Sequence, residues 1–321
     1  MMSSISRIKL TNIPTPLQQV TFENQKFFIK RDDLTGIELS GNKVRKLEYL
    51  LSQAKKEKAE YIFTCGGEQS NHARATVIAA SQLGLKTKLF LWGKAAKSFS
   101  GNSFFYKYFN AEIKFLDRKE YENVNEIMTA ERNKYVKEGK NVFVIPEGGS
   151  TSIGIMGYMD FVDELQKQID LSRIKGIVLA AGSGGTAAGI IAGFTHKKIK
   201  AKVYAVNVLY SKEEIRKKIL MLAEACLLEN NIMTKINPEQ LVVVDGYSKE
   251  GYKNITRKKL SLIKKFALET GIILDPAYTG KAFNAYYDLF ISQHKCGGNI
   301  FLHTGGIWGV MSKSKEYLSI K

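Results

Sequence analysis

The chain has 321 residues, of which 44% are hydrophobic and 25% charged, a composition typical of a soluble globular protein with one large or two medium domains. The 48 Lys and Arg residues exceed the 31 Asp and Glu residues and give a net charge of +17, but they recur as short runs such as KKEK and HKKIK, without a nucleic-acid-binding motif. No apolar run reaches the roughly 18 residues of a membrane span, so the composition excludes a membrane protein and disfavours a nucleic-acid partner, while an attraction for anionic ligands stays open.

In chain order, residues 20–31 (VTFENQKFFIKR) predict a β-hairpin with its turn at Glu23-Asn24. From Lys43 to Ala54 the apolar residues recur at helical spacing. Residues 61–65 predict a buried strand, and residues 72–84 a helix that Gly84 closes. The same patterns predict strands at 86–92, 112–116, 141–146, 176–181, 201–208, 241–245 and 299–306, with helices between them, among them 124–137 and 185–194.

Strands and helices therefore alternate over most of the chain, which predicts an α/β protein with parallel sheets. The sequence contains no repeat, no low-complexity tract and no linker. Two sheet systems fit this number of strands, and their domains can be discontinuous in the sequence. A ligand site is expected at the carboxyl ends of the strands, between the domains.

A glycine-rich loop, GSGGT from Gly182 to Thr186, joins the predicted strand at 176–181 to an apolar helix. Glycines let backbone N–H groups converge on an anion, the helix N-terminus adds a positive potential, and Ser183 and Thr186 can donate hydroxyl hydrogen bonds. The loop lacks the lysine of a P-loop, and Asn207 stands where a dinucleotide site has an acidic residue. The pattern favours a phosphate cup over a dinucleotide site; the alternative is a tight strand–helix turn.

A second strand end, residues 64–75 (TCGGEQSNHARA), carries neutral hydrogen-bond donors at the start of a helix. Gln69, Ser70 and Asn71 suit a carboxylate ligand there, because a helix N-terminus attracts negative charge. Ser70 or Asn71 could equally serve only as the helix cap. This stretch by itself leaves the cap and the ligand site open.

Two further loops and one lysine complete the set. The loops are residues 301–309 (FLHTGGIWG) and residues 274–283 (LDPAYTGKAF), in which Tyr278 is expected to follow a strand and a proline. Lys43 follows Ser-Gly-Asn at the first turn of a predicted helix, the unfavourable end of the helix dipole for a cation. This position indicates either an incidental surface charge or an amine that is kept nearly neutral and reactive. A phosphate cup, a carboxylate cup and an amine nucleophile together suggest pyridoxal 5′-phosphate as the cofactor.

Six motifs occur in a fixed order along the chain: SGNKVRKLEYL, GGEQSNHARA, IPEGGS, GSGGTAAG, LDPAYTGKA and HTGG. In this combination the chain resembles the family of D-cysteine desulfhydrases and 1-aminocyclopropane-1-carboxylate deaminases, over nearly its whole length. The resemblance implies the tryptophan synthase β-like fold (fold type II) of pyridoxal phosphate enzymes, a two-domain α/β fold with open twisted sheets. We expect a discontinuous large cofactor-binding domain of residues 1–47 and 161–321, and a small domain of residues 48–160.

The same resemblance assigns roles to residues of these motifs. Lys43 would bond to the aldehyde of the cofactor, Lys46 would be a counter-charge to its phosphate, and Asn71 would hydrogen-bond its 3′-oxygen. The implied catalytic residues are Lys43, Tyr278, Tyr252 and Ser70; the cofactor-binding residues are Lys43, Lys46, Asn71, Ser183, Gly184, Gly185, Thr186 and Thr279; and the substrate-binding residues are Ser70, Asn71, Gln69 and Thr304. No metal is implied.

Two positions separate the reactions within this family. The pattern of the ring-opening deaminases is YEGK in the tyrosine loop and HLGG near the C-terminus. This chain has YTGK with Thr279 and HTGG with Thr304, which resembles the pattern of the desulfhydrases. A carboxylate keeps the pyridine nitrogen protonated and makes the cofactor a strong electron sink, whereas a threonine hydroxyl does not require that proton. β-Elimination expels its leaving group directly, so a weaker sink suffices. The resemblance thus implies a lyase that converts a D-cysteine-like β-substituted amino acid to pyruvate, ammonia and the leaving group.

Three loops depart from the pattern of the family: Thr151-Ser152, Lys253-Asn254-Ile255 and Ile307-Trp308-Gly309. These loops would border the substrate, so they bear on its identity and leave the cofactor assignment intact. Trp308 is either a core aromatic or a wall of the substrate pocket.

Two other functions compete with this interpretation. The first is ring-opening deamination of 1-aminocyclopropane-1-carboxylate, against which Thr279 and Thr304 argue. The second is a non-catalytic phosphate-ligand or nucleic-acid-binding protein, which Lys43 within the full motif set disfavours. The odd number of cysteines, without paired spacing, and the absence of a signal-peptide core in MMSSISRIKLTN predict reduced thiols in a cytoplasmic protein. We predict a homodimer that acts on a small amino acid.

Overall fold

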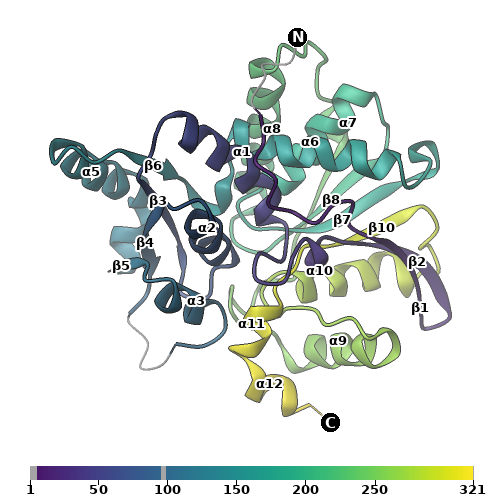
Figure 1. Cartoon of the computed structure of the whole chain (residues 1–321). Helices are drawn as coiled ribbons and strands as arrows, with labels where there is room; N and C mark the ends of the chain where they lie inside the picture. Colours follow the sequence, from purple (N-terminus) through teal and green to yellow (C-terminus); the bar gives the residue numbers. More distant parts are fainter. Residues whose placement is uncertain (1–5, 95–98, 321) are drawn as a thin grey trace.

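The structure is a computed structural model that describes residues 6–94 and 99–320, and within them the strands form two sheets (Figure 1). The strands are β1 (Leu17–Phe22), β2 (Gln25–Arg31), β3 (Tyr61–Gly67), β4 (Lys86–Trp92), β5 (Glu112–Leu116), β6 (Val142–Ile145), β7 (Gly176–Ala181), β8 (Lys202–Asn207), β9 (Leu241–Val244) and β10 (Asn299–His303). The helices are α1 (Lys43–Lys56), α2 (Asn71–Gln82), α3 (Asn102–Tyr108), α4 (Arg118–Glu122), α5 (Val124–Lys137), α6 (Ser152–Gln166), α7 (Gly185–Lys197), α8 (Lys212–Glu229), α9 (Arg257–Thr270), α10 (Thr279–Tyr286), α11 (Ile307–Met311) and α12 (Ser314–Leu318). Apart from one strand predicted before Pro276, the strands predicted between residues 20 and 116 and from 141 to 306 are confirmed within a few residues at their ends.

The larger sheet has the strand order β1-β2-β10-β7-β8-β9. Only β1 and β2 pair antiparallel, and the other neighbours pair parallel. The predicted hairpin turn is confirmed, because Glu23 and Asn24 adopt φ of 47° and 59°, the left-handed values that a tight two-residue hairpin turn needs. The mostly parallel pairing places the carboxyl ends of β7 and β10 next to each other at one edge.

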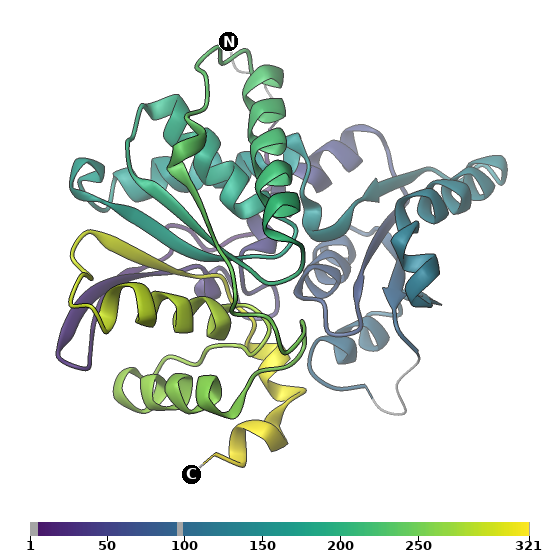
Figure 2. The same cartoon turned by 180° about the vertical axis from the view of Figure 1, so that it is seen from behind.

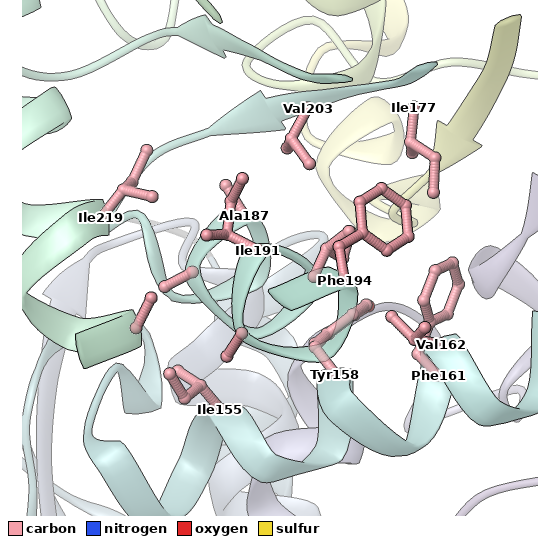
Figure 3. Packing of buried hydrophobic residues seen from close by; sticks show 14 of the residues in the cluster. Ile155, Tyr158, Phe161, Val162, Ile177, Ala187, Ile191, Phe194, Val203 and Ile219 are labelled. Atoms are coloured by element: carbon pink, nitrogen blue, oxygen red, sulfur yellow. The ribbon is translucent and has the colours of Figure 1, made fainter. Parts of the chain in front are cut away.

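Helices cover both faces of the larger sheet, as Figures 1 and 2 show from opposite sides. On one face α6, α7 and α8 contribute a large apolar core with the inner residues of β7 and β8. In Figure 3, Phe194 lies close to Ile177 in this core, with Val203 on one side of it and Phe161 on the other. On the other face α9 and α10 pack in an aromatic-rich core that includes Phe266. Burial of the sheet on both faces explains why its parallel strands are continuous apolar runs.

The smaller sheet is parallel, with the strand order β5-β4-β3-β6. Helices α1 and α2 bury their apolar sides in one core, which includes Leu47 and Ile78. Helix α5 covers the opposite face, where Met128 packs with Phe63 and Phe90. The helix predicted over 124–137 is confirmed at both ends.

The two sheets draw on different parts of the chain, the larger on residues 17–31 and 176–303 and the smaller on residues 61–145. The domain boundaries predicted at residues 47 and 160 fall inside α1 and α6, which are continuous helices. The boundaries themselves stay a prediction. Within the described residues, no helix has the length and apolarity that crossing a membrane requires.

One predicted strand does not form. Residues 272–274, before Pro276, bury Ile272 and Leu274, but they join neither sheet. The reason is that β10 already pairs with β2 on one side and β7 on the other, so the sheet has no free edge there. Instead, the ring of His303 lies 3.0 Å from the carbonyl of Ile273.

A buried ion network fixes α1 against the rest of the fold. Arg45 donates to Asp32 at 2.8 and 2.9 Å and to Glu164 of α6 at 2.9 Å, and Tyr158 donates to Asp32 at 2.6 Å. Lys30 also pairs with Glu164. Burial alone would raise the pKa of Glu164, but the hydrogen bonds and charges of Arg45 and Lys30 lower it to about 2. The network therefore ties the helix that begins at the predicted reactive lysine to β2 and α6.

Candidate active site

Lys43 is the first residue of α1, and it lines spaces that the carboxyl ends of β7 and β3 also line. The turn before it is held from both sides. The N–H of Asn42 donates to the Thr304 carbonyl at 3.0 Å, and the Asn42 amide donates to the Thr186 hydroxyl at 2.9 Å. Gly41 adopts φ of 106°, and a Cβ there would lie 2.8 Å from the Thr304 carbonyl oxygen, so the turn requires glycine.

The environment of Lys43 favours a neutral amine. Burial lowers the pKa of Lys43 to about 8, although the charges of Glu147 and Asp275 raise it. Its Nζ lies 6.0 Å from the centre of the Tyr278 ring. The position at a helix start, which suggested a nearly neutral amine, is thus accompanied by burial that has the same effect.

Lys43 borders two connected spaces. The inner cleft is lined by Lys43, Lys46, Asn71, Thr304, Gly305, Tyr278, Asn42 and residues 180–187. The outer cavity, of about 450 Å³, is lined by Lys43, Gly66, Gly67, Ser70, His72, Trp92, Arg118, Tyr121, Glu122, Glu147, Gly148, Ser183, Leu209, Tyr252 and Tyr278. Of the predicted site residues, only Gln69 and Thr279 line neither space.

The glycine-rich loop and Lys46 form a tight anion cradle at the N-terminus of α7. Lys46 is 1% exposed and donates to the Gly148 carbonyl and to the Ser150 hydroxyl, each at 3.0 Å. A Cβ on Gly185 would lie 2.4 Å from Ser150 Oγ and 2.5 Å from Lys46 Nζ. Burial and then the charge of Lys43 lower the pKa of Lys46 well below its usual range. A bound anion would offset both effects, which is what a phosphate cup requires.

The start of α2 combines a helix cap with a wall of the site. Ser70 is the N-cap and accepts from the Ala73 N–H at 3.2 Å, and it also lines the outer cavity. The amide oxygen of Asn71 accepts from Asn102 at 2.9 Å, which leaves its N–H₂ group for the inner cleft. Gln69 instead bonds to Ser100 and to the backbone of Asn102. Its predicted contact with substrate stays a prediction.

Tyr252 and Tyr278 form a pair beside Lys43. Their hydroxyl oxygens are 2.7 Å apart, and their rings meet edge to face at 5.4 Å. Burial raises the pKa of both phenols, and the charges of Glu147 and Asp275 raise it further. Both side chains are therefore protonated donors at neutral pH.

Thr279 is fully buried at the start of α10 and faces Asp275. Its hydroxyl donates to the Asp275 carboxylate at 2.6 Å and accepts from the Asp275 N–H at 2.8 Å. The carboxylate also accepts from the N–H groups of Ala277, Tyr278 and Thr279. A contact from Thr279 to a ring nitrogen would use the remaining hydroxyl lone pair or require the hydroxyl to rotate. Thr304, by contrast, lines the inner cleft directly.

The comparisons with known proteins agree with this geometry. Residues 8–305 match the protein family described as pyridoxal-phosphate dependent enzyme. The chain belongs to this family. It is 40% identical to a putative 1-aminocyclopropane-1-carboxylate deaminase of Thermotoga maritima, covering 97% of this chain and 99% of the relative. It is 35% identical to the mitochondrial bifunctional D-cysteine desulfhydrase/1-aminocyclopropane-1-carboxylate deaminase of Arabidopsis thaliana, covering 97% of this chain and 80% of that one.

Solved structures confirm the fold of this pyridoxal phosphate enzyme. The structure of a homologue of 1-aminocyclopropane-1-carboxylate deaminase superposes with a TM-score of 0.90 at 34% identity, covering 99% of this chain and 97% of that chain. A fungal L-serine ammonia-lyase from Rhizomucor miehei superposes with a TM-score of 0.63 at 16% identity, covering 96% of this chain and 99% of that chain, and shares the fold. The predicted fold type II architecture, the lyase class and pyridoxal phosphate as cofactor are thereby confirmed.

The residues of this chain fit the cofactor. The cradle between Gly185, Ser150 and Lys46 suits a phosphate, the free N–H₂ group of Asn71 suits a ring oxygen, and the buried amine of Lys43 suits an aldehyde. Sequence reasoning did not assign Ser150, although the motif IPEGGS contains it. The remaining details of the fit are proposals.

The sequence analysis also did not assign two carboxylates and a series of hydrogen-bonded polar side chains. Glu147 and Asp275 both act on the pKa of Lys43, and each lies inside a motif that the sequence analysis identified, IPEGGS and LDPAYTGKA. Asn102, which fixes the Asn71 amide, accepts in turn from Arg74 at 2.7 Å. Asn102 lies outside every motif, so no local signal in the sequence could have found it.

The unusual loops separate into two groups. Trp308 packs edge to face on Phe105 at 4.8 Å and lines neither the inner cleft nor the outer cavity, so it is a packing aromatic rather than a wall of the substrate pocket. Thr151 caps α6 by accepting from the Gly154 N–H at 3.0 Å. Lys253 lies over Trp92, whose side chain lines the outer cavity. Only the loop with Lys253 is thus near the candidate substrate site.

Proposed function

We propose that this pyridoxal phosphate lyase catalyses β-elimination from a D-cysteine-like β-substituted amino acid. With one water, such a substrate gives pyruvate, ammonia and the protonated leaving group. The outer cavity would hold the substrate, because it adjoins Lys43 and is lined by the Ser70 N-cap and by Tyr252 and Tyr278. The predicted homodimer and the predicted cytoplasmic location stay predictions.

The observation that carries this proposal is the absence of acidic side chains from the inner cleft. Among the described residues that line it, none is Asp or Glu, and the position where the deaminase pattern has glutamate is Thr279. The nearby Asp275 is occupied by three N–H groups and the Thr279 hydroxyl. A ring nitrogen without a carboxylate partner is less firmly protonated, which suits expulsion of a good β-leaving group better than opening of a carbon ring.

The bound cofactor supplies an electron sink that acidifies the α-carbon of the amino acid. The phosphate would be held by Lys46, Ser183, Gly184, Gly185 and Thr186, and the 3′-oxygen by Asn71. Thr279 remains the proposed partner of the ring nitrogen. These residues orient the reacting group and take no part in proton transfer.

Lys43 is the proposed base for the α-proton. With its pKa lowered to about 8, roughly one amine in ten is neutral at pH 7 and can accept a proton, and this share rises with pH. The phenols of Tyr252 and Tyr278 are protonated under the same conditions, so they are proposed as donors to the departing group. Ser70, and the N–H groups at the start of α2, would bind the substrate carboxylate.

Ring-opening deamination of 1-aminocyclopropane-1-carboxylate to 2-oxobutyrate and ammonia is the second candidate. The relatives in Thermotoga maritima and Arabidopsis thaliana support it, because both are named as 1-aminocyclopropane-1-carboxylate deaminases and the Arabidopsis thaliana protein is named for both activities. One scaffold can therefore be associated with both reactions. Thr304 and Thr279 are the positions at which we expect the choice to be made.

The test is a panel of D- and L-β-substituted amino acids and 1-aminocyclopropane-1-carboxylate, assayed for pyruvate and for 2-oxobutyrate with cofactor-loaded enzyme. We expect pyruvate from β-chloro-D-alanine and D-cysteine to exceed 2-oxobutyrate. Predominant 2-oxobutyrate would replace the proposal with the deaminase. Absence of both products would show that neither reaction is the activity.

A further inference from the structure

Glu147 is a carboxylate of the outer cavity to which the proposed function gives no task. It begins the short turn Glu147–Gly149, one residue after the end of β6, and lines the cavity together with Lys43. The phenol of Tyr121 donates to one carboxylate oxygen at 2.9 Å, and the phenol of Tyr210 donates to the other at 2.7 Å. Because Tyr121 belongs to α4 and Tyr210 follows β8, the carboxylate is oriented by side chains from both sheet systems.

The two phenols hold the carboxylate by donating hydrogen bonds to it. Burial raises the pKa of Tyr121 and of Tyr210, and the charge of Glu147 raises it further, so both hydroxyls keep their protons and can donate them as hydrogen bonds. Within residues 6–94 and 99–320, Glu147 forms no ion pair with Lys or Arg, and its hydrogen-bond partners are the two phenols. An ionised carboxylate can accept about four hydrogen bonds, so acceptor capacity remains for a ligand.

The other charged side chains that line the outer cavity belong to other elements than Glu147. Arg118 and Glu122 are exposed and belong to the same face of the short helix α4. Lys43 lies at the junction with the inner cleft. Glu147 is therefore the less exposed of the two acidic groups on the wall of the outer cavity, and a cation or strong hydrogen-bond donor is the ligand chemistry that it matches.

We propose that Glu147 binds the side chain of the substrate and selects an amino acid that carries a second amine on its β-carbon, such as 2,3-diaminopropionate. This inference rests on the proposed β-elimination and narrows its substrate class. A β-ammonium group would donate charge-assisted hydrogen bonds to Glu147. A β-sulfonate would instead bring a fixed negative charge next to a carboxylate, whereas a thiol that leaves with a proton from Tyr252 or Tyr278 is neutral.

The reaction balances with this leaving group. Lys43 takes the α-proton, the bond between the β-carbon and its nitrogen breaks, and the electron pair leaves with the nitrogen. That nitrogen keeps its three hydrogens and departs as neutral ammonia. One water then replaces the α-nitrogen, so that 2,3-diaminopropionate and water give pyruvate and two molecules of ammonia.

The experiment compares wild type, Glu147→Gln and the control Glu126→Gln as cofactor-loaded enzymes. Glu126 is exposed on α5 and lines neither space, so its substitution removes one negative charge without touching the site. The kcat/KM for pyruvate formation is measured with both enantiomers of 2,3-diaminopropionate, β-chloroalanine and cysteate. We expect wild type to favour 2,3-diaminopropionate over cysteate, and Glu147→Gln to lower kcat/KM for 2,3-diaminopropionate by about 10- to 100-fold, as for loss of a charge-assisted hydrogen bond. β-Chloroalanine should be little affected, and Glu126→Gln should match wild type.

A binding measurement separates recognition from turnover. Calorimetry with the Lys43→Ala protein, with and without Glu147→Gln, should show the same loss of affinity for 2,3-diaminopropionate and no loss for alanine. An equal effect of Glu147→Gln on all substrates, or a wild-type preference for cysteate, would overturn the proposal while leaving β-elimination intact. If no β-substituted amino acid gives pyruvate, the proposed function fails instead, and the calorimetry still decides whether Glu147 binds the second amine.

Discussion

Lys46 Nζ lies 3.0 Å from the hydroxyl of Ser150, and a Cβ on Gly185 would collide with both atoms. Three segments far apart in the sequence therefore meet at one small volume: the first turn of α1, the loop after β6 and the start of α7. A buried amine whose pKa is lowered by burial and by Lys43 gains from a bound anion. This relationship makes the phosphate cradle testable separately from the chemistry.

Lys46→Ala should weaken retention of the cofactor. Loss of a charge-assisted hydrogen bond of about 1.5–3 kcal/mol corresponds to a dissociation constant raised by about 10- to 100-fold. The measurement is a titration of cofactor-free protein with pyridoxal phosphate, followed by visible absorbance. Lys55→Ala, on the exposed side of the same helix, is the control and should bind like wild type. An unchanged affinity in Lys46→Ala would show that the phosphate lies elsewhere.

Attachment of the cofactor to Lys43 should accelerate with pH. The pKa of Lys43 is lowered to about 8, so below that pH the protonated, non-nucleophilic amine dominates, and above it the neutral amine dominates. The rate of attachment should therefore rise by about tenfold per pH unit below the pKa and level off above it. Stopped-flow absorbance with cofactor-free enzyme measures this profile.

Lys43→Ala should give neither the visible absorbance of the lysine-linked cofactor nor turnover; retention of both would mean that another lysine is used.

Arg45→Met should destabilise the fold strongly, by about 3–5 kcal/mol, because it leaves Asp32 and Glu164 as buried carboxylates without their main partner. The control is Lys197→Met, which breaks the ion pair between Lys197 and Asp163. Because these two side chains are 34% and 47% exposed, we expect little or no change in the free energy of unfolding. Chemical denaturation at neutral pH measures both. If the two variants lose equal stability, the buried network is not what holds α1.

The same network predicts an acid-sensitive contribution to stability. Glu164 has a pKa of about 2 in the folded protein against an ordinary value of 4.5, so the unfolded chain binds its proton first as pH falls. Its contribution is complete above pH 4.5 and is lost as the pH falls toward 2. Denaturation midpoints of wild type and Glu164→Gln, measured at several pH values in this range, should converge as the pH drops. Parallel profiles would contradict the lowered pKa.

Local patterns predicted the strands of both sheets, the hairpin turn at Glu23-Asn24 and the loops that line the inner cleft, because each depends on neighbours in the sequence. They failed where the outcome depends on distant partners. Residues 272–274 have the composition of a strand, but both edges of β10 are taken. The side chain of Gln69 is hydrogen-bonded to Ser100 and Asn102, more than 30 residues away, and its contact with substrate stays a prediction.

The carboxylates show the same limit. The sequence placed Glu147 and Asp275 inside motifs, but only the fold brings both close enough to Lys43 to raise its pKa against the effect of burial. The structure also adds a hydrogen-bond partner to Thr279 that the sequence did not indicate. From the sequence it was a neutral hydroxyl in place of a carboxylate, and in the structure that hydroxyl is hydrogen-bonded to Asp275, a carboxylate whose pKa is raised by burial.

The choice of reaction is testable at Thr279. If Thr279 faces the ring nitrogen, Thr279→Glu should raise the pKa of that nitrogen, because a nearby negative charge favours the protonated pyridinium. The electron sink should deepen, and the ratio of pyruvate from β-chloro-D-alanine or D-cysteine to 2-oxobutyrate from 1-aminocyclopropane-1-carboxylate is the quantity to measure. Ring opening need not appear in the variant, because Thr304 still lines the inner cleft.

The substitution also meets a structural constraint that makes a control necessary. Position 279 is fully buried next to Asp275, so a second carboxylate there repels the first unless one of them is protonated or a cationic ring lies between them. Thr279→Gln has nearly the same size without the charge and serves as the matched variant. A higher affinity for the protonated cofactor in Thr279→Glu than in Thr279→Gln, seen as a shift in the pH dependence of its absorbance, would place residue 279 at the ring nitrogen. Identical spectra in the two variants would show that the ring nitrogen faces another residue, and a wild-type enzyme that forms mainly 2-oxobutyrate would show that Thr279 and Thr304 do not mark elimination.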